Sequence, residues 1–314
     1  MNILVTGGAG FIGSHLVESL IKQSHKVTVL DDFNTYYSPR IKTDNLVPSM
    51  DDINLVNGDI RDRKITNSVF ENGEFDLVIH LAARAGVRPS IQNPFLYSDV
   101  NCNGTMNLLE LSKQYGVKRF FFASSSSVYG NNKKIPFHEN DPVENPISPY
   151  AATKRAGELF CANYHELYDI EIACLRFFTV YGPRQRPDMA IHKFTKAIEN
   201  GDTITMFGDG TSERNYTYVE DIVEGVLGLI EKHKGFEIYN LAGDGSIELK
   251  DLITLIAEKC GKEAKIQQQD MQPGDVDRTV ADFTRLRELT GYNPQFPIDK
   301  GIEEFVNWYK RGYV

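Results

Sequence analysis

Short apolar runs alternate with longer helical patterns along the first 180 residues of the chain. Six near-continuous apolar runs predict buried strands at 2–6, 26–31, 53–59, 75–83, 118–125 and 170–178. Between them, apolar residues recur at helical spacing, most clearly near 12–23, 95–115 and 150–168. Strands that alternate with helices in this way predict a doubly wound, parallel α/β (Rossmann) sheet with helices on both faces.

The pattern changes after about residue 180. Loops rich in glycine, proline and aspartate, such as YGPRQRPDM, FGDGTSERN and QPGDVDR, separate shorter elements, and helical spacing returns near 191–200, 219–232, 248–260, 283–290 and 299–311. We therefore expect an NAD-binding domain at 1–178 and a smaller C-terminal substrate-binding α/β lobe at 179–314, some segments of which return to the first domain. The sequence contains no linker, so a cleft is expected between two tightly packed lobes.

Composition narrows the class of protein. A formal net charge of −9 over 314 residues argues against a nucleic-acid surface, which needs clustered lysine and arginine. No segment approaches the ~18–20 apolar residues that span a bilayer, so no membrane partner is expected. The four cysteines and seven histidines show no metal-ligand spacing, which predicts no metal site. A strand pattern that begins at Asn2 leaves no room for a signal peptide, and we expect a reduced, cytoplasmic location.

The segment GGAGFIG (7–13) lies between the first predicted strand and the first predicted helix. It satisfies G-x-G-x-x-G through Gly8, Gly10 and Gly13, and G-x-x-G-x-x-G if Gly7 is taken as the first position. A tight turn alone can require glycine, but between a strand and a helix this pattern favours a dinucleotide site. The backbone can then approach a pyrophosphate, which meets the positive end of the helix dipole.

Other polar and small residues follow the predicted strands. Asp31 ends the second strand 18 residues beyond Gly13, where a carboxylate can accept from the adenosine ribose hydroxyls and would repel a 2′-phosphate. NAD is therefore favoured over NADP, although Asp31 and Asp32 could instead only cap a loop. Asp59 and Ile60 follow the third strand, and Leu81, Ala82 and Ala83 follow the fourth, at the carboxyl ends that form the binding edge of such sheets.

YAATK places Tyr150 and Lys154 four residues apart, and hence on one face of a helix. The pKa of free tyrosine is about 10, so a nearby ammonium and a positive nicotinamide ring would both have to favour the phenolate. The serines of SSSSVYG (124–130) end a predicted strand, where a hydroxyl can complete a proton path between substrate and phenolate. A chance Y-x-x-x-K is common, but its place after the fifth strand favours a functional pair.

With these motifs in order, the whole chain resembles the extended short-chain dehydrogenases/reductases that act on nucleotide sugars. GGAGFIG, SSSSVYG, SPYAATK, RFFTVYGP and QPGDV carry the resemblance. It implies catalytic roles for Ser125, Tyr150 and Lys154, and a homodimer in which the helices near 95–115 and 150–168 pair across a two-fold axis. The implied NAD contacts are Gly7, Gly10, Phe11, Ile12, Asp31, Asp32, Asp59, Ile60, Leu81, Ala82, Ala83, Asn101, Tyr150, Lys154 and Phe178.

The resemblance also gives meaning to the serine run. In related 4,6-dehydratases the positions of Ser126 and Ser127 carry an Asp–Glu pair that eliminates water, and in related UDP-glucuronate decarboxylases position 127 is glutamate. This chain has only hydroxyls at both positions. A transient 4-keto sugar would then take its hydride back, which implies an epimerase.

The segment FFTVYGPRQRPDMA resembles UDP-glucuronate 4-epimerases, as do DDFNTYYSPRIK, AARAGVRPS and MQPGDV, whereas UDP-galactose 4-epimerases typically carry asparagine and NPxGAH here. From the residues alone, Arg184 and Arg186 lie on a loop that enters the cleft, where they could clamp a carboxylate or a diphosphate, or form a solvated turn. The resemblance makes Thr179, Ser126 and Arg186 the candidate carboxylate contacts. Arg88 is a further predicted substrate contact.

ITMFGDGTSERNY (204–216) resembles the loop that holds the nucleotide diphosphate, with Arg214 on phosphate and Thr205 near the uridine. Galactose epimerases carry a second phosphate arginine at the position of Gln272; here either Arg278 substitutes or the grip is weaker. Thr279 stands where a bulky residue can exclude N-acetyl groups, so exclusion of UDP-N-acetylhexosamines is not predicted.

The sequence thus predicts an NAD-dependent UDP-sugar 4-epimerase that interconverts UDP-glucuronate and UDP-galacturonate. An epimerase of UDP-glucose and UDP-galactose, or of UDP-N-acetylhexosamines, is the alternative within the class. A non-catalytic NAD-binding regulatory protein is the alternative from another class, because fold alone does not establish activity.

Overall fold

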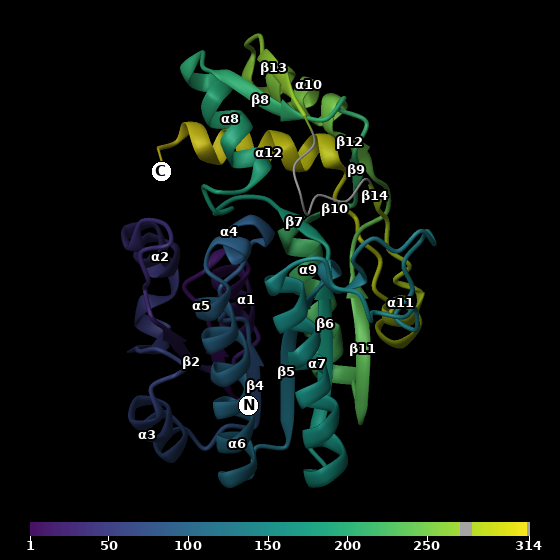
Figure 1. Ribbon diagram of the computed structural model, residues 1–314. Helices are drawn as coiled ribbons and strands as arrows, with labels where there is room; N and C mark the ends of the chain where they lie inside the picture. The colour runs from purple at the N-terminus through teal and green to yellow at the C-terminus, as the bar shows by residue number, and fades with distance from the viewer. Residues whose placement is uncertain (271–277, 313–314) are drawn as a thin grey trace.

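A seven-stranded parallel sheet forms the larger half of the molecule in the computed structural model, which describes residues 1–270 and 278–312 (Figure 1). Its strand order is β11-β6-β5-β4-β1-β2-β3, and neighbouring strands are parallel. The strands are β1 (Asn2–Thr6), β2 (Lys26–Asp31), β3 (Ile53–Asn57), β4 (Leu77–His80), β5 (Arg119–Ser125), β6 (Glu171–Phe177) and β11 (Phe236–Leu241). The doubly wound fold is confirmed, with its switch point between β1 and β4.

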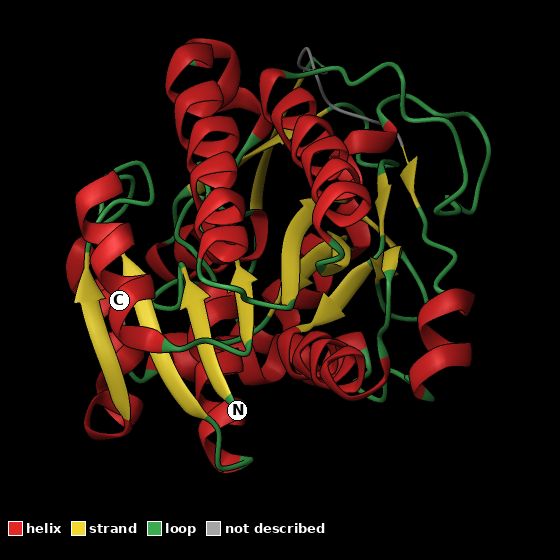
Figure 2. Cartoon of the chain, turned by 90° about the horizontal axis from the view of Figure 1, so that it is seen from below, coloured by secondary structure: helices red, strands yellow, loops and turns green. Residues whose placement is uncertain are grey.

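Helices cover both faces of this sheet, as the view along its layers shows (Figure 2). The helical segments of this half are α1 (Phe11–Lys22), α2 (Pro39–Leu46), η1 (Val47–Asp52), α3 (Arg63–Gly73), α4 (Val87–Gln92), α5 (Pro94–Ser98), η2 (Asp99–Gly104), α6 (Thr105–Gln114), η3 (Ser126–Tyr129), α7 (Pro149–Tyr168) and α9 (Val219–Lys232). On β5, Phe121 belongs to the core under α1 and α9, whereas Phe120 and Phe122 belong to the core under α3, α6 and α7. Because both faces are buried, the strand reads as one continuous apolar run.

The C-terminal lobe contains three small sheets. β8 (Thr203–Phe207) pairs with β13 (Lys265–Gln269), and β7 (Thr179–Tyr181) pairs with β10 (Tyr216–Tyr218). β9 (Glu213–Arg214) lies between β12 (Ile247–Glu248) and β14 (Arg278–Thr279). The helices α8 (Ala190–Asn200), α10 (Leu249–Cys260) and α12 (Ile298–Lys310) share a separate apolar core in this lobe, while α11 (Thr284–Thr290) packs near β11.

Two features of the larger half differ from the sequence pattern. The seventh strand, β11, was not among the predicted strands: Phe236, Glu237 and Ile238 are half-buried, so its apolar signal is diluted by its edge position. Residues after 178 therefore complete the first sheet. The helix expected near 95–115 is built from α5, a π-helical turn (η2) and α6. This turn carries Asn101, whose carbonyl accepts from Thr105 Oγ1 at 2.6 Å.

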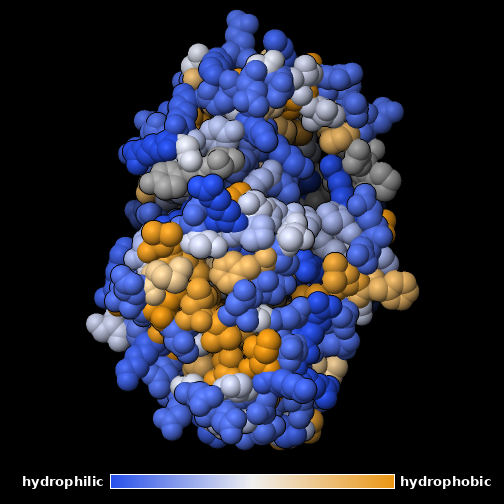
Figure 3. Space-filling model, turned by 90° about the vertical axis from the view of Figure 1, so that its left-hand side faces the viewer, coloured by the Kyte–Doolittle hydropathy of each residue, from blue (hydrophilic) through white to orange (hydrophobic). Residues whose placement is uncertain are grey.

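The surface differs between the two halves. Seen from the side of α2 and α3, hydrophobic side chains gather over the sheet-containing half, whereas the C-terminal lobe is mainly polar (Figure 3). The sheet-containing half carries exposed Val47 in η1 and half-buried Leu55 in the edge strand β3. None of the described helices combines the length and apolar character needed to cross a membrane.

Candidate functional site

The carboxyl ends of the parallel strands open into a cavity of about 330 Å³. The last residues of β5 and segments that follow β1, β2, β3, β4 and β6 all contribute to its wall, together with the first turns of α1 and α7. The predicted cofactor residues on this wall are Gly7, Gly10, Phe11, Ile12, Asp31, Asp32, Asp59, Ile60, Leu81, Ala82, Ala83, Tyr150, Lys154 and Phe178. Sheet topology thus brings together side chains that are far apart in sequence.

The glycine turn is packed so tightly that side chains are excluded. Gly7 has φ 73°, and a Cβ there would lie 2.6 Å from the backbone nitrogen of Ala82. A Cβ on Gly13 would lie 2.3 Å from the carbonyl oxygen of Gly7. Helix α1 begins directly after Gly10, so its first N–H groups face the cavity end of β1. This cradle fits the pyrophosphate of a dinucleotide.

Two carboxylates follow β2. Asp31 is buried, and its oxygens accept from the backbone nitrogens of Ala9 at 3.2 Å and Phe33 at 3.0 Å. Burial raises the pKa of Asp31, while the Lys42 ammonium, 3.9 Å away, acts in the opposite direction. Asp32 faces the Arg84 guanidinium at 3.6 Å. These carboxylates stand at the strand end that reads a ribose in dinucleotide folds, and they fit NAD.

Asn101 lies behind the cavity and not on its wall. Its Oδ1 accepts from the Arg84 backbone nitrogen at 2.8 Å, and its Nδ2 donates to the Arg84 carbonyl at 3.0 Å and to Thr153 Oγ1 at 3.0 Å. Asn101 therefore fixes the loop after β4, whose backbone forms part of the wall.

Tyr150 and Lys154 occupy the first turns of α7, which Ser148 caps through the backbone N–H of Ala151. Lys154 is buried, and its Nζ donates to the Ala123 carbonyl at 2.7 Å. This Nζ lies 6.0 Å from the centre of the Tyr150 ring. Burial lowers the pKa of Lys154 to about 8, so its charge is sensitive to mildly alkaline pH.

Ser125 stands at the end of β5, where its Oγ accepts from the Ser127 backbone N–H at 3.2 Å. Burial raises the pKa of Tyr150, and a hydrogen bond from Ser125 and the charge of Arg186 act in the opposite direction. In the protein alone burial therefore outweighs its neighbours, whereas the sequence-based expectation was a lowered pKa with a cofactor ring present. A further positive charge is needed for an effective base at neutral pH.

A second cavity of about 470 Å³ lies in the C-terminal lobe. Three predicted substrate residues, Arg88, Thr205 and Arg214, line it. The Arg88 guanidinium lies 4.8 Å from the centre of the Phe207 ring, which joins α4 of the larger half to β8. The cavity is therefore bounded by both halves of the molecule.

Arg186 lines the first cavity and its partner Asp188 lines the second. Arg186 Nε and Nη2 donate to the two oxygens of Asp188 at 2.9 and 2.8 Å, and the Tyr36 hydroxyl donates to Asp188 at 3.2 Å. The sequence pattern indicated neither Tyr36 nor Asp188. The only signal was that both lie in segments that carry the family resemblance.

The other predicted contacts lie away from the two cavity walls. Arg184 does not enter the cleft as expected: it adopts φ 65° and forms a 2.6 Å ion pair with Glu18 of α1. Ser126 and Thr179 are half-buried and line neither cavity. Arg278 forms an ion pair with Glu213. The QPGDV landmark and Gln272 lie outside the described residues, among which no cluster of His, Cys, Asp or Glu could hold a metal ion.

The chain is similar in sequence and in structure to known nucleotide-sugar enzymes. Residues 4–305 match the family model described as GDP-mannose 4,6 dehydratase. The chain is 41% identical over 310 residues to a UDP-glucuronate 4-epimerase of Thermodesulfobacterium geofontis, covering 98% of this chain and 95% of that one. A UDP-glucuronic acid 4-epimerase from Bacillus cereus, solved with UDP-glucuronic acid and NAD, has a TM-score of 0.93 at 35% identity over 99% of both chains. A Thermotoga maritima UDP-glucose 4-epimerase solved with UDP-glucose has a TM-score of 0.92 at 32% identity, also over 99% of both chains.

Proposed function

This chain belongs to the extended short-chain dehydrogenase/reductase family of NAD-dependent nucleotide-sugar epimerases and dehydratases, and we propose that within it the protein interconverts UDP-glucuronate and UDP-galacturonate. One observation supports epimerisation above all: the turn after Ser125 presents two hydroxyls, Ser126 and Ser127. A serine hydroxyl is too weak an acid to replace the carboxyl groups that elimination of water requires. A 4-keto sugar held here therefore lacks the acid that would eliminate water, which leaves return of the hydride as its main fate.

The residues of the first cavity support this chemistry. The glycine turn, Asp31 and Asp59 would hold NAD, which supplies a reversible acceptor for the C4 hydride when bound. Tyr150 takes the proton of the sugar O4 through Ser125 Oγ, and Lys154 holds positive charge near the phenolate. After the sugar turns about its diphosphate linkage, the hydride would return to the other face of C4 while Tyr150 returns the proton to O4, so the opposite configuration at C4 results.

Arg186 supports a carboxylated sugar. Asp188 occupies Nε and one hydrogen of Nη2, so the Nη1 edge of the guanidinium is left for a second carboxylate. Oxidation of UDP-glucuronate at C4 gives a β-keto acid, which loses CO₂ when its carboxylate stands perpendicular to the ketone plane. We infer that Arg186, Thr179 and Ser126 hold the carboxylate in an orientation that resists this loss.

The Arg186–Asp188 pair also favours a second candidate, an epimerase of neutral or N-acetylated UDP-sugars. Asp188 largely neutralises the guanidinium, and the pair could accept the hydroxyl of a neutral sugar. The Thermotoga maritima UDP-glucose 4-epimerase is almost as similar to this chain in structure as the Bacillus cereus UDP-glucuronic acid 4-epimerase is.

The experiment compares Arg186→Ala with Arg184→Ala, a matched arginine on the same loop that pairs with α1. With UDP-glucuronate, Arg186→Ala should lose roughly 10- to 100-fold in kcat/KM, because a hydrogen bond to a charged group contributes about 1.5–3 kcal/mol. With UDP-glucose the loss should be small, and UDP-4-keto-pentose or UDP-pentose should appear only from the acid substrate. Thr179→Ala should show the same preference to a smaller degree.

Arg184→Ala should leave the ratio of the two kcat/KM values unchanged. Equal loss of both substrates in Arg186→Ala, without pentose, would contradict the role in carboxylate recognition and favour the neutral-sugar epimerase. A wild-type panel that adds UDP-N-acetylglucosamine, with products resolved by configuration at C4, decides among the three sugars.

We also propose a homodimer formed through α5, α6 and α7. Phe95, Leu159 and Leu167 are large apolar residues on these helices, and they are 87%, 54% and 59% exposed. Apolar exposure of this kind marks an interface. Leu159→Glu should convert a dimer to a monomer in size-exclusion chromatography with light scattering; a wild-type monomer would contradict the proposal. The cytoplasmic location stays a prediction.

A further inference from the structure

The tyrosine of the SSSSVYG motif has no part in the chemistry proposed above. Tyr129 ends the 3-10 turn η3, which carries Ser126 and Ser127. Its side chain is 3% exposed and points into the protein interior, and it does not line either cavity. The hydroxyl donates to Oδ1 of Asn240 on β11 at 2.7 Å, across 111 residues of sequence.

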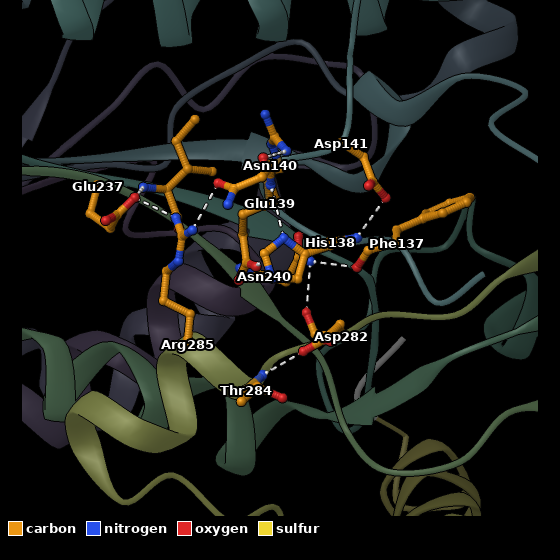
Figure 4. Close-up of polar contacts among 12 residues, drawn as sticks. Phe137, His138, Glu139, Asn140, Asp141, Glu237, Asn240, Asp282, Thr284 and Arg285 are labelled. Carbon is orange, nitrogen blue, oxygen red and sulfur yellow. Dashed lines mark hydrogen bonds and ion pairs between the residues drawn. The ribbon is translucent and has the colours of Figure 1, made fainter. Parts of the chain in front are cut away.

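Asn240 joins three separate segments through one buried amide, and Figure 4 shows its contacts with Phe137 and Asp282. While Oδ1 accepts from Tyr129, Nδ2 donates to the carbonyl oxygens of Phe137 at 2.9 Å and Asp282 at 2.8 Å. Its backbone N–H donates to Oε1 of buried Glu139 at 3.0 Å. Both amide hydrogens and the amide oxygen are used, so a rotation of this side chain would break all of its side-chain hydrogen bonds.

The Tyr129 ring is fixed on its faces as well. Its centre lies 4.8 Å from that of Phe137 and 6.2 Å from that of Phe178, which lines the first cavity. The Arg176 guanidinium on β6 lies 4.7 Å from the ring centre. The turn η3 is therefore attached to β6 and β11, the two strands at one edge of the sheet.

Arg176 extends this attachment to the helix that carries Tyr150 and Lys154. Arg176 Nε and Nη2 donate to both oxygens of Glu158 on α7, at 2.8 and 2.9 Å. Glu158 also accepts from the Ser124 hydroxyl at 2.6 Å, next to Ser125. A continuous network of buried side chains thus connects the turn 126–129 with α7.

We propose that Tyr129 and Asn240 are positioning residues that hold the turn 126–129, and with it Ser125 Oγ, at a fixed distance from Tyr150. The physical link is the Ser127 N–H, which donates to Ser125 Oγ: a displacement of the turn moves the hydroxyl that relays the proton. The inference rests on the proposed roles of Ser125 and Tyr150. It does not depend on which UDP-sugar is the substrate.

Tyr129→Phe tests this inference because it removes one oxygen and keeps the ring. Tyr239→Phe is the matched control. Tyr239 precedes Asn240 on β11 and is equally buried at 3% exposure, and its hydroxyl contacts Nδ1 of His233, at the C-terminal end of α9, at 3.1 Å. Both variants should lower Tm to a similar degree, since each loses one buried hydrogen bond. Only Tyr129→Phe should lower kcat, by about tenfold, with KM and NAD content near those of wild type.

Asn240→Ser breaks the same link from the other side and retains a polar group. It should reproduce the loss of kcat, and the double variant should lose little more than the more severely affected single variant, because either substitution already breaks the Tyr129–Asn240 hydrogen bond. A Tyr129→Phe enzyme whose kcat is within twofold of wild type would overturn the inference. So would an equal loss of kcat in Tyr239→Phe.

Hydrogen–deuterium exchange of the peptide 124–130 gives a readout that needs no substrate. Exchange there should be faster in Tyr129→Phe than in Tyr239→Phe or wild type, and equal exchange in all three contradicts the anchoring. A wild-type protein that turns over no UDP-sugar would count against the proposed function, and the exchange experiment would still decide whether Tyr129 anchors the turn.

Discussion

The two halves of the molecule place their functional residues by different means. In the larger half, ligand positions follow the ends of strands that are held by a continuous ladder, such as the seven-residue β5. In the C-terminal lobe, β9 has only two residues, and Arg186, on the loop between β7 and α8, is held by its ion pair with Asp188. On the roles proposed above, the residues whose chemistry needs a fixed geometry lie on the sheet, whereas the residues that select the substrate are held by side-chain pairs.

The largest effect should come from Tyr150→Phe, on the sheet side of this comparison. Loss of the general base should lower kcat by about 10³-fold or more, while NAD content and fold stay intact. The matched control is Tyr164→Phe on the same helix, whose hydroxyl donates to Glu110 on the protein surface. Steady-state epimerisation and NAD content of purified protein are the measurements; activity within tenfold of wild type would remove Tyr150 from the mechanism.

The next effect concerns stability and contrasts buried with exposed ion pairs. Arg176→Met removes the fully buried partner of Glu158, which keeps only its ion pair with partly exposed Arg155, and should lower the free energy of unfolding by about 3 kcal/mol. Lys262→Met removes a half-exposed partner of Glu199 in the C-terminal lobe and should cost about 1 kcal/mol or less. Urea denaturation of both variants measures the two changes in unfolding free energy. Similar losses would contradict the expected difference between the buried pair of the larger half and the exposed pair of the C-terminal lobe.

The pH dependence of the reaction should test the role of Lys154, a buried cation of the larger half. Because burial lowers the pKa of Lys154 to about 8, the ammonium loses its proton as pH rises through that value. The kcat/KM should fall about tenfold per pH unit above pH 8, whereas protonation of Tyr150 limits it on the acid side. Lys154→Arg should be slower but should lack this alkaline limb, since a guanidinium keeps its proton. An identical limb in both proteins would assign it to another group.

A smaller effect is expected at the ribose end of the larger half. Asp31→Asn should reduce the preference for NAD over NADP by about tenfold, because one repulsive charge is removed while Lys42 and Arg84 remain nearby. Asp188→Asn is the control from the other half and should leave this preference unchanged. Titration of each variant with both cofactors measures the ratio. An unchanged ratio in Asp31→Asn would show that another residue reads the ribose.

The difference between the two halves also explains which structural features could be predicted from the sequence. Six strands, the glycine turn and the Tyr150–Lys154 pair were visible because each depends on residues close together in the chain. β11 was missed because half of its residues are partly exposed at a sheet edge. The Tyr36–Asp188 contact spans 152 residues and the Arg184–Glu18 pair joins a loop to α1, so neither leaves a local pattern. Side-chain partners of this kind are set by the packed fold alone.

The late position of β11 constrains the order in which a growing chain can fold. β6 is complete at Phe177, but the strand that covers its outer edge is not made until Phe236–Leu241. During that interval the apolar run IACLRF offers unpaired N–H and C=O groups, which are a template for pairing with other nascent chains. A fragment that stops at residue 178 would keep this edge open permanently and should aggregate. A usable cofactor-binding fragment would therefore have to supply β11 as well.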